Sequence, residues 1–505
     1  MAVTRAGVVL LLLVGCTREP PAAGLGRRRA EGDVLALRAS SDGEYLAYLK
    51  NCLTVKDRTL PAGTATCELW LASSQGDLAR RIAEGVTTLP YGFAWSGRGH
   101  ALAALAAYDP VEGSGRLVLW AGGEPERLAE GVTFYAFDGA GTRLGFVAGG
   151  RLFLASVGEG PVAVEGAEGI ATFEFGRGTP ELELLARQSA RKGGELWAVQ
   201  GRAVRPVAAS VRDYAFARDG ARFAFTSGLA QALAVAPAAT LRPTPPLGRD
   251  VQTFLFSPRG DAIAYLADAV PGRQGDLWVA PLGSGAPRRL AERVGEPRWC
   301  RDGSRLAWLA DYDPRSRTGR LGVGALSGES FSLAKNVSDF DLTPDGAAVA
   351  YLVHETAGGY SVDLGLARPG ADGPPEKLAK GVFGFSFSPD GKWLYWRTHC
   401  VREAEACDLA RLSLTAGTSA ANPERVADGV KSYEFAPGRP DRLLIGYSRK
   451  DRIALDLAIW EGGRLKAVDT LVLPGSAQFL GKNPTRLGYA LVDPRRRGVY
   501  VAEVP

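Results

Sequence analysis

Short apolar stretches alternate with turns rich in Gly and Pro along the chain, and the same order of segments recurs. In the unit from about residue 339 to 380, Phe340 and Leu342 alternate with polar residues before the turn Pro344-Asp345-Gly346. Three further segments, apolar or short and polar, follow at residues 348–352, 363–367 and 376–379. This alternation with a period of two, interrupted by turn residues, predicts four β-strands in the unit.

The turn motif of this unit has eleven near-copies, spaced about 40–45 residues apart. The clearest copies occupy residues 256–260, 299–303, 342–346 and 387–391. One sheet of four short strands cannot cover both of its apolar faces, whereas sheets stacked around an axis cover one another. The sequence therefore predicts an all-β fold, a β-propeller built of about eleven four-stranded blades.

The number of repeats also bears on the number of rings. Eleven blades exceed the usual count of about four to eight per ring, so we expect two rings, with five and six blades, rather than one large ring. A stretch rich in proline near Pro237 and Pro246 would separate residues 30–245, with repeats 1–5, from residues 246–505, with repeats 6–11.

The residue just before the aromatic of each turn motif gives a second indication of two rings. It is Ala94, Ala136, Glu174, Ala215 and Leu255 in repeats two to six, then Arg298, Asp341, Ser386, Glu434 and Gln478 in repeats seven to eleven, with Arg38 in repeat one. The change from mostly apolar to mostly polar residues suits rings of five and six blades, with repeat one in the second ring. Coincidence is the alternative interpretation.

The two ends of the chain are expected to meet in one sheet. The last repeat stops after its third strand, at residues 498–502. Residues 28–32 resemble the fourth strands at residues 81–85 and 127–131. An N-terminal strand near residues 28–32 would thus complete the last blade and cover an open sheet edge.

The N-terminus resembles an export signal. Arg5 precedes an apolar run over residues 7–14, which is too short to span a bilayer. The run ends in Leu13-Val14-Gly15-Cys16, which resembles the lipobox of bacterial lipoproteins. The resemblance implies a signal peptide at residues 1–15, lipidation of Cys16 and a tether over residues 16–29. It also implies outer-membrane attachment, facing the periplasm or the cell surface. The alternative is an ordinary secretory signal.

Four cysteines occupy matching places in two repeats. Cys52 and Cys400 each lie at the end of a second strand, and Cys67 and Cys407 each begin a third strand. Opposed residues of antiparallel strands are close enough for a disulfide, so we predict the bridges Cys52–Cys67 and Cys400–Cys407. Disulfides agree with an oxidising compartment outside the cytosol. Cys300 takes the Ser position of its turn motif, and we expect its thiol to be unreactive.

The repeats resemble those of the TolB periplasmic family. Its hallmark is Ser-Pro-Asp-Gly-x-x-Leu-x-Tyr followed by Leu-Trp-Val, and residues 387–396 and 276–280 match these segments. The resemblance covers roughly residues 30–505 and implies a propeller with repeats of the WD-like, Pro-Asp-Gly type. TolB proteins also carry an N-terminal α/β domain, whereas the repeats of this chain begin almost directly after the tether.

Charge and motifs narrow the function. A net charge of +5 over 505 residues does not indicate a nucleic-acid partner. No H-E-x-x-H or G-x-S-x-G motif occurs, so we assign no catalytic residue, no metal ligand and no cofactor, although Ca²⁺ remains an alternative. Candidate binding residues are Arg298, Asp341, Glu434, Gln478, His354, His399, Asp109 and Asp313. The His pair and the two Asp-Pro hairpins also have purely structural interpretations, as loop residues and turn formers.

These features predict a lipid-anchored propeller of the cell envelope. We expect it to be a scaffold that binds another envelope protein, a peptide or a glycan, rather than an enzyme. Longer hairpin loops, clamped by the predicted disulfides, would lie on the binding face. One alternative is a metal-dependent lactonase or a lyase with an acidic central channel that includes Glu174, Asp341 and Glu434. The other is an inert structural lipoprotein.

Overall fold

The computed structural model describes residues 24–504 except 57–59, 77, 177–183, 189–193, 201–202, 269–273, 284, 355–361, 372–373, 402–405, 416–422 and 450–453. The predicted signal peptide, Cys16, most of the tether and the turn of repeat four near Thr179 lie outside the described residues. The described residues form β-strands and no helix. Consequently, no helix in this part of the chain is long and apolar enough to cross a membrane.

The strands fall into successive antiparallel groups, here called units and numbered along the chain. Unit 1 contains β2 (Ala36–Ala39), β3 (Tyr45–Thr54), β4 (Ala65–Ser73) and β5 (Ala79–Thr87). Unit 2 contains β6 (Phe93–Trp95), β7 (Leu102–Asp109), β8 (Ser114–Trp120) and the first part of β9 (Glu126–Phe137). Unit 3 contains the rest of β9, β10 (Arg143–Ala148), β11 (Arg151–Ser156) and β12 (Val162–Glu168). Unit 4 contains β13 (Ile170–Phe175), β14 (Leu184–Gln188), β15 (Gly194–Gln200) and the first part of β16 (Ala203–Phe216). Unit 5 contains the rest of β16, β17 (Arg222–Ser227) and β18 (Ala232–Pro237). Unit 6 contains β19 (Thr253–Phe256), β20 (Ala262–Ala267), β21 (Asp276–Pro281) and β22 (Arg288–Ala291).

The remaining units follow the same order. Unit 7 contains β23 (Arg298–Trp299), β24 (Arg305–Asp313), β25 (Thr318–Ala325) and the first part of β26 (Ser330–Leu342). Unit 8 contains the rest of β26, β27 (Val349–His354), β28 (Val362–Ala367) and β29 (Glu376–Ala379). Unit 9 contains β30 (Gly384–Phe387), β31 (Trp393–Val401), β32 (Ala406–Ser413) and the first part of β33 (Glu424–Ala436). Unit 10 contains the rest of β33, β34 (Arg439–Ser448), β35 (Leu455–Glu461) and β36 (Arg464–Val472). Unit 11 contains β37 (Gln478–Phe479), β38 (Arg486–Leu491), β39 (Gly498–Glu503) and β1 (Arg27–Glu31).

The turn motif owes its sequence to a small hydrogen-bond network. In unit 9 the Ser388 hydroxyl donates to the Asp390 carboxylate at 2.6 Å and accepts the Trp393 amide at 3.0 Å. Gly391 has φ of 72°, a conformation that favours glycine. In unit 7 the Cys300 thiol takes the serine position and donates to the Asp302 carboxylate at 3.1 Å. Burial raises the pKa of this thiol, as expected for an unreactive structural cysteine.

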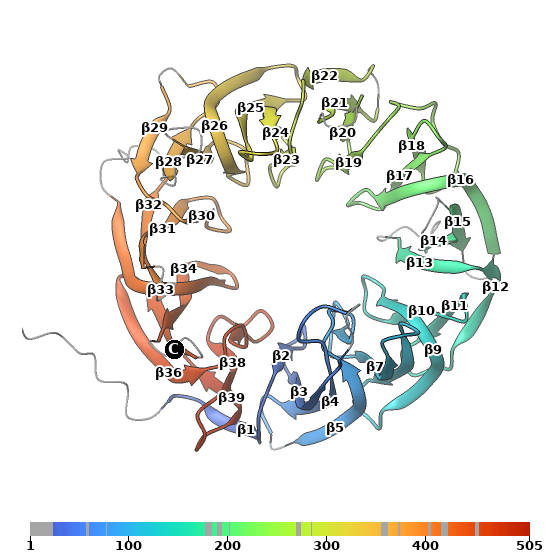
Figure 1. Cartoon of the computed structure of the whole chain (residues 1–505), viewed down its shortest axis with the longest axis vertical. Helices are drawn as coiled ribbons and strands as arrows, with labels where there is room; N and C mark the ends of the chain where they lie inside the picture. Colours follow the sequence, from blue (N-terminus) through green and yellow to red (C-terminus); the bar gives the residue numbers. More distant parts are fainter. Residues whose placement is uncertain are drawn as a thin grey trace, which may run out of the picture.

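The units stand side by side around a wide central opening, and the chain passes once around the ring (Figure 1). Eleven hydrophobic clusters lie among the described residues, and each joins two neighbouring units. The circle is closed by a cluster in which Leu37 and Leu46 of unit 1 pack with Val499 and Val501 of unit 11. Each sheet thus covers its apolar faces with its two neighbours, in an all-β, propeller-like ring.

The expectation of two rings is wrong. Val235 of unit 5 and Ile263 of unit 6 share one cluster across the proposed boundary, and Figure 1 shows one continuous ring. The proline-rich stretch instead lies along the outer edge of unit 5, where the Thr244 amide donates to the Val235 carbonyl at 2.8 Å. Proline is tolerated at a sheet edge because its missing N–H leaves no interior partner unpaired. This stretch therefore finishes a unit without separating two domains.

The N-terminal strand closes the last sheet at the place where residues 28–32 are expected. β1 pairs with β39 in antiparallel register, with Arg27 opposite Val501 and Glu31 opposite Gly498. Ala30 joins the cluster between units 11 and 1. The segment before β1 also contacts unit 10, because the Leu25 amide donates to the Val468 carbonyl of β36 at 2.9 Å. The two ends of the chain therefore stabilise each other.

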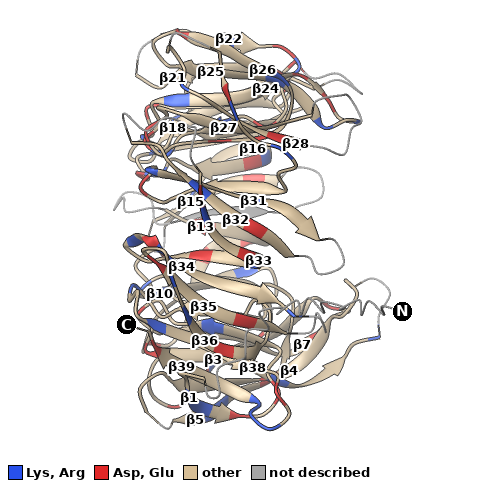
Figure 2. Cartoon of the chain, turned by 90° about the vertical axis from the view of Figure 1, so that its left-hand side faces the viewer, with Lys and Arg blue, Asp and Glu red and all other residues tan. Residues whose placement is uncertain are grey.

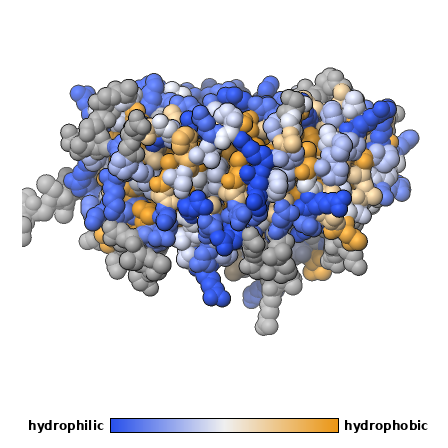
Figure 3. Space-filling view, turned by 90° about the horizontal axis from the view of Figure 1, so that it is seen from above, coloured by the Kyte–Doolittle hydropathy of each residue, from blue (hydrophilic) through white to orange (hydrophobic). Residues whose placement is uncertain are grey.

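The ring has two different faces. We call the face that carries the turn motifs the turn face, and the face that carries the hairpins between the second and third strands the loop face. In the side view of Figure 2, acidic and basic residues are interspersed along the strands on the side of the ring that faces the viewer. Another view of the wall shows hydrophilic groups over most of it, with apolar groups scattered between them (Figure 3).

Candidate functional site on the loop face

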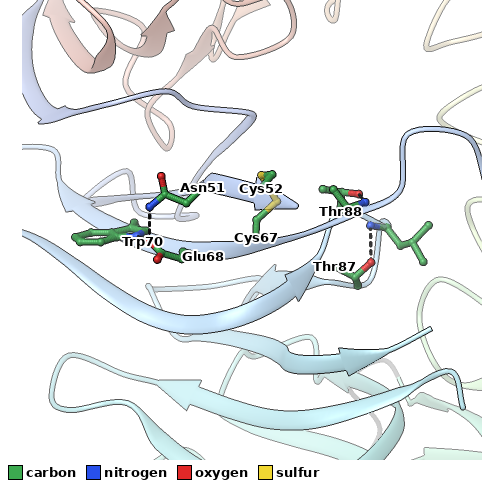
Figure 4. The surroundings of a disulfide bond; sticks show 9 residues. Asn51, Cys52, Cys67, Glu68, Trp70, Thr87 and Thr88 are labelled. Atoms are coloured by element: carbon green, nitrogen blue, oxygen red, sulfur yellow. Dashed lines mark hydrogen bonds between the residues drawn. A yellow bond between two sulfur atoms is a disulfide. The ribbon is translucent and has the colours of Figure 1, made fainter. Parts of the chain in front are cut away.

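Two hairpins of the loop face are clamped by disulfides. Cys52 of β3 and Cys67 of β4 are bonded, with their Cα atoms 4.1 Å apart, and Cys400 of β31 is bonded to Cys407 of β32. Beside the first bridge, Glu68 accepts hydrogen bonds from Asn51 at 2.8 Å and from the Trp70 indole at 2.7 Å (Figure 4). These covalent and polar contacts hold the ends of the hairpins in fixed positions.

Large apolar side chains are exposed mainly on the same face. Leu53 follows Cys52 and is 75% exposed, and Val401 follows Cys400 and is 53% exposed. The exposed large apolar residues of the loop face are Leu35, Leu53, Tyr91, Val111, Leu229, Phe383 and Val401. The others among the described residues are Leu25, Leu78 and Val162, none of which lies in a hairpin or crossover of the loop face. The loop face therefore carries most of the exposed large apolar side chains among the described residues.

A cleft of about 1020 Å³ opens where units 6, 7 and 8 meet at the loop face. Phe254 and Leu255 of β19 form one side, and Ser338 to Phe340 of β26 form the other. The hairpin between β24 and β25 covers it with Tyr312, Pro314 and Arg317. The cleft is lined by aromatic and charged groups together, which suits a ligand with both apolar and polar parts.

Asp311 fixes the hairpin that covers the cleft and precedes the lining residue Tyr312. Its carboxylate pairs with Arg293 from the preceding connection and with Arg320 of β25, the latter at 3.0 Å. The hydrogen bond from Arg293, followed by that from Arg320, holds the pKa of Asp311 below its usual value. The adjacent Tyr312 amide donates to the Arg293 carbonyl at 2.9 Å. The hairpin is thereby fixed against the connection that leads into β23.

Two charged side chains of the cleft are available to a ligand. Within the described residues, neither Arg317 nor Glu296 makes a side-chain hydrogen bond or ion pair, and both are exposed. Arg298 is different, because its guanidinium lies 4.9 Å from the centre of the Phe340 ring and donates to the Phe340 carbonyl. Arg317 can therefore bind a carboxylate of a ligand, and Glu296 can accept hydrogen bonds from an amine or hydroxyl group.

The inner-strand candidates belong to several units, and the structure does not gather them into one site. Gln478 donates to the Leu37 carbonyl at 3.1 Å and accepts the Ala39 amide at 2.9 Å, so it ties unit 11 to unit 1. Arg298 ties unit 7 to unit 8 in the same way. Burial raises the pKa of Asp341 in unit 8 and of Glu434 in unit 10, but unit 9 lies between them.

The hairpin candidates are also separate from one another. The Asp109 carboxylate accepts the Val111 amide at 2.8 Å, and Asp313 accepts the Arg315 amide at 2.9 Å, so both stabilise their own turns. His399 is exposed and lies 3.4 Å from Asp408, and His354 is half-buried at the end of β27. Glu296 and Arg317 were not among the sequence candidates. Two sequence signals point to this cleft, namely the candidate Arg298, which lines it, and the hairpin Asp311-Tyr312-Asp313-Pro314.

Adding a methyl group at Gly295 should distort the cleft. A Cβ at this position would lie 2.9 Å from Tyr312 Cδ2, so the ring must move. We expect Gly295→Ala to lower the free energy of unfolding by about 1–3 kcal/mol, as overpacking usually does. Gly283→Ala is the control, because a Cβ there meets nothing within 4 Å. Equal denaturation midpoints for the two variants would show that Tyr312 does not pack on Gly295.

Comparisons with known proteins give resemblances of architecture alone. No protein-family model matches the sequence, and no curated protein sequence matches it. A eukaryotic initiation factor has 12% sequence identity and a TM-score of 0.44, over 75% of this chain and 96% of that one. The tricorn protease has 11% identity and a TM-score of 0.31, over 93% of this chain and 57% of that one.

A putative TolB from Agrobacterium tumefaciens has 17% identity and a TM-score of 0.25, over 42% of this chain and 81% of that chain. Likenesses at this level are too low to transfer an activity, a partner or a site. The description of the fold therefore rests on the strand pairing, the hydrophobic clusters and the ring in Figure 1.

Proposed function

We propose that this chain is a lipid-anchored β-propeller of the cell envelope, with eleven blades in one ring, that binds a protein, peptide or glycan. The blade count is supported by eleven turn motifs in the sequence and by the hydrophobic clusters between neighbouring units. A ring of this size presents a broad face, and such faces serve many propellers as binding surfaces.

The observation that carries the binding role is the composition of the loop face. Exposed apolar side chains and two disulfide-clamped hairpins occur there, together with a cleft whose Arg317 and Glu296 pair with no other described residue. Hairpins that are already rigid lose little conformational freedom when a partner binds, so more of the contact energy is available for affinity. The partner class that suits this mixture is a protein or peptide, or a glycan with charged groups.

The envelope location is supported by the N-terminal sequence and by the cysteines. The lipobox-like residues 13–16 and the preceding apolar run suit export and acylation of Cys16. Two disulfides suit an oxidising compartment. We propose attachment to the outer membrane, facing the periplasm or the cell surface. Replacing Cys16 by serine should abolish metabolic labelling with palmitate, and continued labelling of that variant would contradict the proposed anchor.

A scaffold suits the described residues better than an enzyme of the lactonase or lyase type. The two inner carboxyl groups with raised pKa, Asp341 and Glu434, lie in units separated by a third unit, so they do not form an acid–base pair. We therefore propose no catalytic residue and no cofactor for catalysis, Ca²⁺ included. An inert structural lipoprotein remains the competing proposal, and it differs in having no saturable partner.

Site-specific cross-linking in intact cells tests the binding role. A photoreactive amino acid at Val111, on the loop face, should yield a discrete cross-linked partner. The same residue at Val162 is the matched control, because this exposed valine begins a fourth strand away from the loop face. Cross-links from Val162 alone, or none from Val111, would contradict binding through the loop face. A saturable partner at Val111 would exclude the inert alternative.

A further inference from the structure

We infer that Asp42, Glu44 and His100 form a binding site for a divalent transition-metal ion. The site lies on the turn face, away from the loop face and its cleft. Asp42 and Glu44 belong to the turn between β2 and β3 in unit 1, and His100 belongs to the turn between β6 and β7 in unit 2. An ion bound there would join the turn motifs of two neighbouring units. The inference is independent of the proposed binding role.

The ligand atoms converge on one point between the two turns. His100 Nδ1 lies 2.8 Å from Asp42 Oδ2 and 3.7 Å from Glu44 Oε2. One atom of each side chain lies within 4.8 Å of an atom of each of the others. Ligand atoms around a zinc ion sit about 2.0–2.2 Å from the metal, so neighbouring ligands are about 3–4 Å apart. The present spacing needs only small side-chain adjustments to reach that geometry.

The surroundings hold two of the three ligands in position. The other oxygen of Asp42, Oδ1, accepts the Ser40 hydroxyl at 2.6 Å and the Glu44 amide at 3.0 Å, so Oδ2 is directed toward His100. The His100 ring packs against Tyr45, with ring centres 5.0 Å apart, and against Trp120 at 5.9 Å. Such outer contacts fix the orientation of ligands and raise metal affinity. The site is therefore largely formed before an ion arrives.

The donor set determines the class of metal. One imidazole nitrogen and two carboxylate oxygens suit Zn²⁺, Co²⁺, Ni²⁺ or Mn²⁺, whereas Ca²⁺ prefers six to eight oxygen ligands. The His100 Nδ1–H group can donate to only one of the two carboxylates, whereas a metal ion can bind all three side chains. His100 is about one-third exposed, so water can complete the coordination.

The other histidines provide a matched comparison. His399 Nδ1 lies 3.4 Å from Asp408, but the second charged neighbour of that carboxylate is Arg425, at 4.0 Å. No group of three His, Cys, Asp or Glu ligands includes His399 among the described residues. A cation beside Asp408 opposes metal binding there. His399→Ala is thus a control that removes a histidine next to an aspartate without removing the inferred site.

The purified chain, freed of metal with a chelator, should bind one equivalent of Zn²⁺ in equilibrium dialysis. Co²⁺ should give the visible absorption of a bound ion. We expect Glu44→Gln and His100→Ala each to weaken Zn²⁺ binding at least tenfold, and His399→Ala to leave it unchanged. Glu44 is exposed, so its variant keeps the test valid if His100→Ala fails to fold. Absence of stoichiometric Zn²⁺ binding, or the same affinity in Glu44→Gln and the unaltered chain, would overturn the inference.

Discussion

Replacing Asp469 by alanine is expected to lower the free energy of unfolding by about 3 kcal/mol. This carboxylate is 1% exposed and accepts the Tyr489 hydroxyl at 2.8 Å. Arg496 donates to both of its oxygens at 2.9 Å. Without Asp469, a buried hydroxyl loses its acceptor and a partly buried guanidinium loses its counter-charge. The three residues lie where units 10 and 11 meet the first described residues, so the loss weakens the junction between these two units.

Two variants make the Asp469 experiment specific. Asp33→Ala removes the partner of Arg497, an exposed ion pair at 2.8 Å, and should cost less than about 1 kcal/mol. Replacing Asp469, Tyr489 and Arg496 together with Leu, Phe and Met should recover much of the stability, because the buried hydroxyl and the guanidinium are removed together with their acceptor. Only the Thr470 amide, which donates to Asp469 Oδ1 at 2.8 Å, then loses its acceptor. Chemical denaturation followed by tryptophan fluorescence would compare them. A loss in Asp469→Ala no larger than in Asp33→Ala would show that the junction of units 10 and 11 does not depend on this cluster.

Deleting residues 27–31, which form β1, is expected to convert the protein from a monodisperse species into aggregates or strand-exchanged oligomers. The deletion exposes the outer edge of β39, so that its residues from Gly498 to Val501 pair only with β38. It also removes Ala30 from the cluster that joins unit 11 to unit 1. An unpaired edge next to an opened hydrophobic seam recruits strands from other molecules.

Size-exclusion chromatography with light scattering and a thermal melt would measure the effect of this deletion. Deleting residues 17–23, which precede the described part of the chain, is the control for shortening the N-terminus. We expect the control to behave as the unaltered chain does. If the variant without residues 27–31 remains equally monodisperse and melts at the same temperature as the control, the N-terminal strand does not close the ring.

Local features of the fold could be predicted because they depend on near neighbours in the sequence. Alternating apolar residues and the Pro-Asp-Gly turns indicated the strands, since both follow from backbone geometry. The cysteine positions placed opposed residues on adjacent strands, and the structure contains both bridges. The likeness of residues 28–32 to other fourth strands pointed to the role of β1, because equivalent positions in a repeat have equivalent partners.

The ring number could not be predicted from the same signals. The usual range of blade numbers only describes how often each ring size occurs. The size at which this ring closes depends on how tightly each pair of neighbouring sheets packs. The polar residues that precede the turn aromatics were misleading for a physical reason. Gln478 and Arg298 reach the inner strand of the next unit, so they tie units together and do not mark a second ring.

The candidate sites depend on contacts between units, and these require the three-dimensional order of the sheets. His100 and Asp42 are 58 residues apart and meet only because successive turn motifs lie side by side. Glu296 and Arg317 line one cleft because Tyr312 and its hairpin fold back over the connection before β23. Sequence patterns identify the hairpin, but the approach of two loops is set by packing across the unit boundary.

Cryo-electron microscopy of the purified protein, viewed down the ring axis, tests the central claim most directly. The account predicts one closed circle of eleven sheets, with the N-terminal strand forming the outer edge of the last sheet. Two smaller circles joined near residue 245, or a circle left open between the first and last sheets, would contradict it.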